Sequence, residues 1–110
     1  MAYTPKILYP SGYPSNGGET IYTVPTNTST IVKNIVMTNT TNNDASIHIS
    51  VVPPSGSAAS SNRIASDLTI PANGINTLDI SVVMPSGGSL HATNITNQAI
   101  VLTVSGVEIN

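Results

Sequence analysis

The strongest constraint on this chain is its supply of side chains that branch at Cβ. Ile (13), Val (10) and Thr (14) occupy 37 of the 110 positions, whereas Leu occupies 5. Branching at Cβ restricts side-chain rotation in a helix but suits the pleated surface of a strand. Short apolar runs alternate with turn residues at the spacing of a β-sandwich. We therefore predict an all-β fold without helices: one antiparallel sandwich, of jelly-roll or immunoglobulin-like type, with about eight short strands.

The strands are predicted from the alternation of apolar and polar residues and from the turn residues that bound each run. The expected strands are residues 20–24, 29–39, 45–52, 63–70, 75–80, 81–84, 90–93 and 99–109. In the run 29–39, apolar residues occupy both odd and even positions, which point to opposite faces of a strand. This indicates a central strand that is partly covered on both sides. The pair Asn73-Gly74 favours positive φ and predicts a hairpin between 63–70 and 75–80.

Residues 1–18 differ from the rest of the chain because Pro5, Pro10 and Pro14 recur there. Proline removes a backbone donor and favours extended geometry in the residue before it. We expect an extended N-terminal arm over 1–18, followed by a sandwich domain over 19–110; a disordered tail is the alternative. Apolar side chains of the arm would be costly to leave in water, so we expect them to contact another protein. These residues are Tyr3, Ile7, Leu8, Tyr9 and Tyr13.

The scarcity of charge excludes several classes of function. The three basic residues, Lys6, Lys33 and Arg63, are too few to neutralise a useful number of phosphates, so we expect no nucleic-acid partner. No apolar run approaches the roughly 18 residues of a membrane span, and residues 1–6 lack the pattern of a secretory signal. The absence of Cys excludes disulfides and zinc–thiolate sites.

The sequence also lacks a recognisable catalytic motif. The two imidazoles, His48 and His91, are not accompanied by a Gly-x-Ser-x-Gly elbow, and the five carboxylates are scattered singly along the chain. A calcium loop would place acids at alternate positions, and none does. We predict no catalytic, cofactor-binding or metal-binding residues, and a protein that is not an enzyme.

Several short motifs resemble those of a known group of viral proteins. Residues 22–28 read YTVPTNT, residues 32–35 read VKNI, an Asn-Thr pair follows at 39–40, and residues 105–109 read SGVEI. With these motifs, residues 22–109 resemble small structural proteins of tailed-bacteriophage virions. The resemblance implies a β-sandwich virion component without catalytic residues.

Together these observations predict a bacteriophage virion structural protein, most specifically a capsid decoration (cement) protein that is assembled in the bacterial cytoplasm. Many weak copies on a symmetric shell bind strongly through multivalency. The expected partners are the major capsid protein and further copies of the chain, with a trimer as the first choice and a dimer as the second. One alternative is a neck, tail or fibre-associated module. Another is a carbohydrate-binding module or small hydrolase, which would bring His48 or His91 beside Asp67 or Asp79 in a cleft, or would line a groove with Tyr residues.

Overall fold

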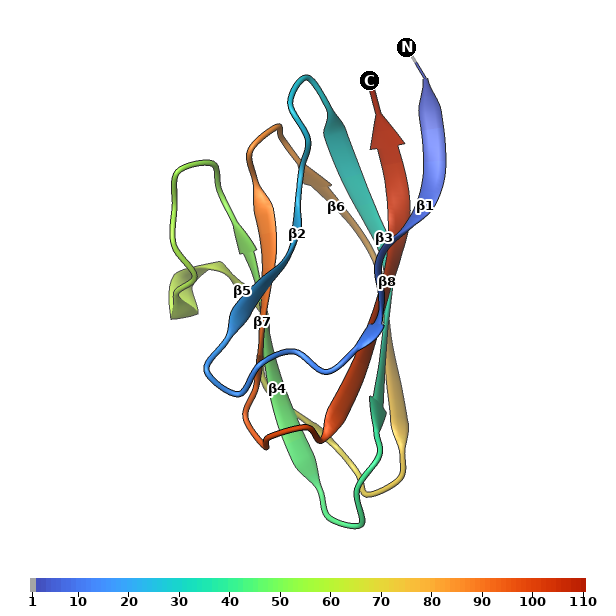
Figure 1. Cartoon of the computed structure of the whole chain (residues 1–110), viewed down its shortest axis with the longest axis vertical. Helices are drawn as coiled ribbons and strands as arrows, with labels where there is room; N and C mark the ends of the chain where they lie inside the picture. Colours follow the sequence, from blue (N-terminus) through green and yellow to red (C-terminus); the bar gives the residue numbers. More distant parts are fainter. Residues whose placement is uncertain (1) are drawn as a thin grey trace.

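The computed structural model describes residues 2–110, which form eight β-strands and one turn of 3-10 helix (Figure 1). The strands are β1 (Tyr3–Gly12), β2 (Glu19–Thr23), β3 (Ser29–Asn39), β4 (Ala45–Val52), β5 (Arg63–Ile70), β6 (Ile75–Met84), β7 (Ser89–Asn94) and β8 (Ile100–Ile109). The helical turn, η1 (Ser60–Asn62), lies in the connection between β4 and β5. The predicted all-β fold is confirmed.

The strands form two four-stranded sheets with the orders β1-β8-β3-β6 and β2-β7-β4-β5, and every pairing is antiparallel. The first strand pairs with the eighth, the second with the seventh, the third with the sixth and the fourth with the fifth. This nested pairing is that of a long hairpin folded across two sheets, which is the jelly roll. Of the two predicted sandwich types, the structure therefore has the jelly roll.

The core lies between the two sheets and is built from the inward side chains of both. Ile35 and Met37 of β3, Ile47 and Ile49 of β4, and Leu102 of β8 are fully buried. Two buried amides are also satisfied there. The Nδ2 group of Asn39 donates to the carbonyl oxygens of Asn43 and Ile70 at 2.8 and 2.9 Å, and that of Asn94 donates to the carbonyl oxygen of Ile100 at 2.9 Å. These bonds fix the loops that close one end of the core.

The strand boundaries predicted for β3, β4 and β5 are correct, whereas the expected break in β6 is absent. Residues 75–84 form one strand, because exposed and half-buried side chains alternate without interruption as far as Val83. The hairpin predicted at Asn73-Gly74 is also wrong. Asn73 has the expected positive φ of 55° and the Gly74 amide donates to the carbonyl of Pro71, but this turn passes between the sheets. Turn residues set a local reversal, whereas burial of apolar faces sets the pairing.

The N-terminal segment is extended as predicted, but most of it belongs to the sandwich. Residues 3–12 form the edge strand β1, whose pairing with β8 runs from Tyr3 opposite Ile109 to Gly12 opposite Leu102. An edge strand tolerates Pro5 and Pro10 because only one of its sides must supply donors. The boundary at residue 18 therefore does not separate an arm from the sandwich in the described part, 2–110; Met1, also assigned to the arm, lies outside it.

Candidate interaction surface

The structure brings one of the two histidines, His48, next to Asp67, one of the two candidate acidic residues. His48 Nδ1 accepts a hydrogen bond of 2.8 Å from the backbone N–H of Asp67, which has a φ of 54° in an irregular part of β5. Asp79 lies in the opposite sheet. The hydrogen bond to His48 comes from the backbone of Asp67 and not from its carboxylate. Within residues 2–110, no group of three or more His, Cys, Asp or Glu side chains is placed to hold a metal ion.

The outer face of the sheet β2-β7-β4-β5 is polar. Its outward positions alternate with the buried side chains of Ile47, Ile49, Leu90 and Ala92. Hydroxyl and imidazole groups fill these positions on β4 and β7: Ser46, His48, Ser50, Ser89, His91 and Thr93. Val52, which lies opposite Ser89 on this face, and Ser50 are buried at 6% and 3% exposure, so the face is mainly polar but only partly open to water.

The outer face of the other sheet carries a row of apolar side chains that crosses all four strands. Pro5 of β1 lies opposite Val107 of β8, Val107 lies opposite Ile31 of β3, and Ile31 lies opposite Val83 of β6. Residues directly opposite one another in a sheet share a face, so the four side chains are neighbours. Ile31 stands between the buried residues Thr30 and Val32, which confirms that it points outward.

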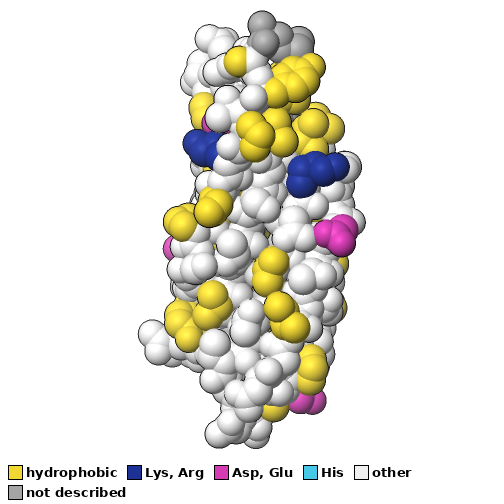
Figure 2. Space-filling model, turned by 90° about the vertical axis from the view of Figure 1, so that its right-hand side faces the viewer, with side chains coloured by type: hydrophobic (Ala, Val, Ile, Leu, Met, Phe, Trp, Pro, Cys, Tyr) yellow, Lys and Arg dark blue, Asp and Glu magenta, His cyan; other side chains and the backbone are white. Residues whose placement is uncertain are grey.

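The next row toward the chain ends adds Tyr3 and Ile109, which are opposite one another on β1 and β8. We call these six residues the apolar band: Tyr3, Pro5, Ile31, Val83, Val107 and Ile109. Tyr3 is 65% exposed and Val83 is 66% exposed. In Figure 2, which views this side of the molecule, apolar side chains gather near the upper end, beyond the two basic residues on this face. Other apolar side chains are exposed elsewhere, such as Ile75 at 62% on β6, but an apolar cluster that crosses four strands indicates a protein contact.

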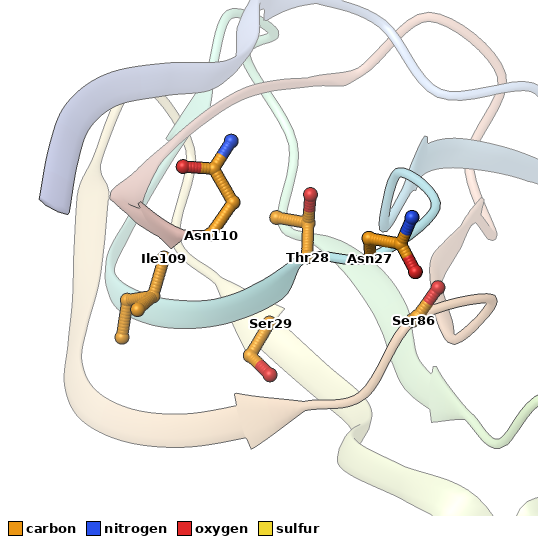
Figure 3. A pocket seen from close by; sticks show the side chains of 6 residues that line it. All are labelled: Asn27, Thr28, Ser29, Ser86, Ile109 and Asn110. Atoms are coloured by element: carbon orange, nitrogen blue, oxygen red, sulfur yellow. The ribbon is translucent and has the colours of Figure 1, made fainter. Parts of the chain in front are cut away.

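A hollow of about 350 Å³ adjoins the apolar band at the same end of the sandwich (Figure 3). It lies where the turn before β3, the turn after β6 and the end of β8 meet. Its lining residues carry amide, hydroxyl and apolar side chains and no charged one: Asn27, Thr28, Ser29, Ser86, Ile109 and Asn110. Ile109 belongs to both the band and the hollow, so the two form one continuous surface.

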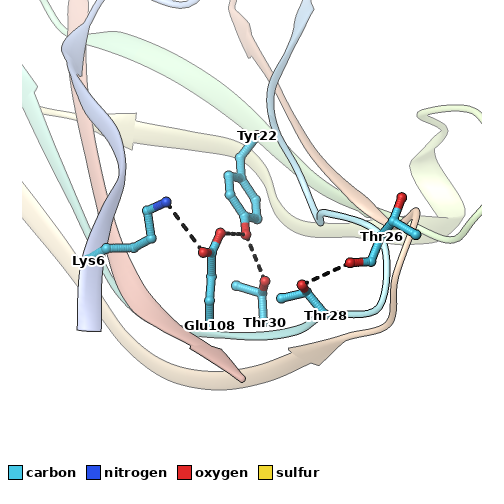
Figure 4. Close-up of polar contacts among 6 residues, drawn as sticks. All are labelled: Lys6, Tyr22, Thr26, Thr28, Thr30 and Glu108. Carbon is cyan, nitrogen blue, oxygen red and sulfur yellow. Dashed lines mark hydrogen bonds and ion pairs between the residues drawn. The ribbon is translucent and has the colours of Figure 1, made fainter. Parts of the chain in front are cut away.

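A polar network beneath the band holds this end of the two sheets together (Figure 4). The Tyr22 hydroxyl of β2 donates to Glu108 Oε2 of β8 at 2.6 Å, and Lys6 Nζ of β1 lies 3.3 Å from Glu108 Oε1. Thr30 Oγ1 of β3 lies 2.7 Å from the Tyr22 hydroxyl oxygen. Burial, reinforced by the hydrogen bond to Glu108, raises the pKa of Tyr22 to about 12. Because Glu108 separates Val107 from Ile109, the network also fixes the backbone of the band.

The structure divides the five predicted contact residues into three groups. Tyr3 lies in the band, and Ile7, 58% exposed, lies beside it on β1. Tyr13 is exposed, but its hydroxyl bonds to Thr40 Oγ1 at 3.0 Å, beyond the far end of β1. Leu8 lies in the core with only 7% exposure, and Tyr9 packs against that core. The expectation that Leu8 contacts another protein is therefore wrong, because its side chain fills this chain's own interior.

Sequence reasoning missed five of the six band residues: Pro5, Ile31, Val83, Val107 and Ile109. The available signal was an apolar residue at one of the alternate strand positions that point away from the core, such as Ile31 between Thr30 and Val32. The alternation within one strand does not show which outward residues of different strands lie side by side. Their alignment follows from pairings between strands that are far apart in the sequence.

No protein-family model matches the chain, and no characterised protein matches it in sequence. Among solved structures, it is similar to a chain in the structure of infectious bursal disease virus, Gx strain, with 14% identity and a TM-score of 0.54. The match covers 97% of this chain but 31% of the viral chain, so this chain spans about a third of that protein. A structure of the Drosophila NLP core, described as giving insight into pentamer formation and histone binding, matches over all of both chains with 13% identity and a TM-score of 0.46. The viral likeness supports the sandwich fold.

No helix in the described residues has the length and apolar character needed to cross a membrane.

Proposed function

We propose that this chain is a virion structural protein that acts by binding other proteins. The observation that carries the proposal is the apolar band, which leaves large apolar side chains in water on one face of the sandwich. A fully exposed side chain of this size gains about 1.5–3 kcal/mol when a partner covers it. The hollow beside the band offers a partner a place to anchor a side chain.

Two likenesses support a place in a virus particle. The solved chain with the higher TM-score comes from a virus, and the motifs YTVPTNT, VKNI and SGVEI resemble those of tailed-bacteriophage structural proteins. The more specific role that we propose is capsid decoration: many copies bind the major capsid protein and stabilise the head, after assembly in the bacterial cytoplasm. The low charge of the chain lets such copies crowd together with little repulsion.

This proposal can be tested by mixing the purified chain with phage heads that lack it and sedimenting the particles. We expect the wild-type chain to saturate the heads, and Val83→Asp to bind about tenfold more weakly because a charge would be buried in the contact. Thr69→Asp is the matched control, since Thr69 is equally an exposed strand residue but lies on β5 of the other sheet. Equal binding by wild type and Val83→Asp, or no binding by any variant, would contradict the proposal.

The number of bound copies separates decoration from the neck or tail alternative. Decoration predicts copies distributed over the whole shell, in proportion to the capsid protein. Binding limited to a single vertex, with bare shell elsewhere, would instead support a neck, tail or fibre-associated module.

A further inference from the structure

Two features of the same face complement each other in shape. Tyr3, at the outer edge of the apolar band on β1, is 65% exposed. The hollow lies on the other side of Ile109, toward Ser29 of β3. A projecting aromatic ring and a hollow are thus separated by the width of one strand, β8.

We propose that a second copy of this chain covers the end of the apolar band that lies on β1, β8 and β3, with Tyr3 of each copy filling the hollow of the other; Val83 on β6, two strands from the axis, stays free for the capsid contact. This inference rests on the proposed function, which treats the band as a protein-binding surface, and it names the partner. The two copies would be related by a two-fold axis that passes close to Ile109.

The hollow fits this occupant in size and chemistry. Its volume of about 350 Å³ lies at the small end of ligand sites, where one aromatic side chain is a suitable guest. A tyrosine combines a large apolar ring with a hydroxyl that needs a partner when it is buried. Ile109 supplies the apolar wall, whereas Asn27, Ser29 and Ser86 supply groups that can bond to the hydroxyl.

The position of the two features determines the symmetry. A ring of three or more copies joins one surface of each subunit to a different surface of the next. Here the ring of Tyr3 and the hollow are on the same face, so both are engaged at once only when two copies meet face to face. This geometry favours a dimer over the trimer that we expected first.

Charge does not oppose the contact. The six residues of the apolar band and the lining of the hollow carry no charged side chain. At the margin of the band, Lys6 is paired with Glu108. Farther along the same face, Lys33 bonds to Ser81 at 2.7 Å and Asp79 accepts a bond of 2.7 Å from Asn34. These opposite charges leave the surrounding surface neutral.

The contact area indicates a weak dimer. Three strands at a spacing of about 4.8 Å and two residue rows about 6.8 Å apart give an area on the order of 200 Å² per copy. A standard stable interface covers about 800 Å² per partner. We therefore expect the purified chain to dimerise at high protein concentration, in the range from micromolar to millimolar.

Sedimentation velocity over a concentration series tests the association of the purified full-length chain. We expect the sedimentation coefficient of the wild type to rise with concentration, and Tyr3→Ala to weaken association by about tenfold or more. Tyr13→Ala is the matched control, because Tyr13 is an exposed tyrosine outside the band, and we expect it to behave as wild type. A wild type that stays monomeric up to the millimolar range, or equal association by Tyr3→Ala, would overturn the inference.

A single introduced cysteine tests the position of the axis, because the natural chain has none. Ile109→Cys places two thiols near one another across the proposed axis, so mild oxidation should give a covalent dimer. Thr69→Cys, on the opposite sheet, should stay monomeric under the same conditions. Efficient cross-linking of Thr69→Cys but not of Ile109→Cys would overturn the inference.

The failure of the dimer and the failure of the proposed function can be told apart. If the chain stays monomeric and still binds phage heads, only the dimer is refuted. If the chain dimerises but never binds heads, only the proposed function is refuted.

Discussion

At the scale of single residues, backbone packing under the apolar band leaves no room for a side chain at Gly106. A Cβ atom there would collide with the carbonyl oxygen of Ile31 and lie 3.1 Å from Leu8 Cδ1. The strands β3 and β8 change register beside this point, between Val32 and Asn34. Glycine is therefore required because the backbones approach closely here, at the base of the band.

We expect Gly106→Ala to lower the free energy of unfolding by about 2 kcal/mol, since the clash is with backbone that cannot rotate away. Gly17→Ala is the control, because the nearest atom to a Cβ at Gly17 is Ser15 Oγ at 3.8 Å. Urea unfolding followed by circular dichroism measures both variants. Equal midpoints for Gly106→Ala and wild type would show that β3 and β8 are not packed as described.

The Tyr22 hydroxyl gives the molecule a dependence on pH in the alkaline range. Its pKa is raised to about 12 in the folded chain, chiefly by burial and then by the bond to Glu108, against an ordinary value of 10.0. The unfolded chain therefore releases this proton at a lower pH than the folded chain does. The contribution to stability is complete below pH 10 and is lost as the pH rises toward 12.

We therefore expect the stability of the wild type to fall more steeply between pH 10 and pH 12 than that of Tyr22→Phe, which has no proton to lose at this site. Tyr9, whose pKa is raised by burial and by Glu19, adds a similar slope to both proteins and cancels in the comparison. Unfolding midpoints at several pH values measure the difference. Parallel pH profiles for the two proteins would contradict the described environment of Tyr22.

At the scale of elements, the sequence predicts the strands better than their partners. Apolar alternation and flanking turn residues are local signals, and they located β3, β4 and β5 at their observed bounds. The prolines of β1 argue against a central strand and so predict an arm, although they are also compatible with an edge strand. The candidate surface was found only in part, through Tyr3, because alignment of Ile31, Val83 and Val107 depends on long-range pairing.

Because β1 completes one sheet, removing residues 2–12 should destabilise the sandwich rather than leave it intact. The truncation removes Leu8 from the core and exposes the edge of β8, which favours aggregation. We expect a loss of at least about 3 kcal/mol, on the order of the cost of one buried leucine. Leu8→Ala in the full chain separates the packing contribution from that of the strand. A truncated chain that unfolds at the wild-type urea concentration would restore the view of a separate arm.

At the scale of the whole molecule, the two faces of the sandwich have different characters. One sheet presents hydroxyl and imidazole groups, whereas the other presents the apolar band and the hollow at one end. The chain ends meet at the same end of the sandwich, where the backbone amide of Ala2 bonds to the carbonyl of Asn110 and the amide of Asn110 bonds to the carbonyl of Ala2. A molecule with this asymmetry suits a role in which one surface is covered by protein and the other faces water.

The most direct test is a cryo-electron microscopy reconstruction of the intact phage particle at a resolution that allows this chain to be traced. The account predicts copies over the head surface, with the apolar band covered by protein and the sheet β2-β7-β4-β5 facing solvent. A map in which the chain is absent from the particle, or in which the band faces solvent in every copy, would contradict it.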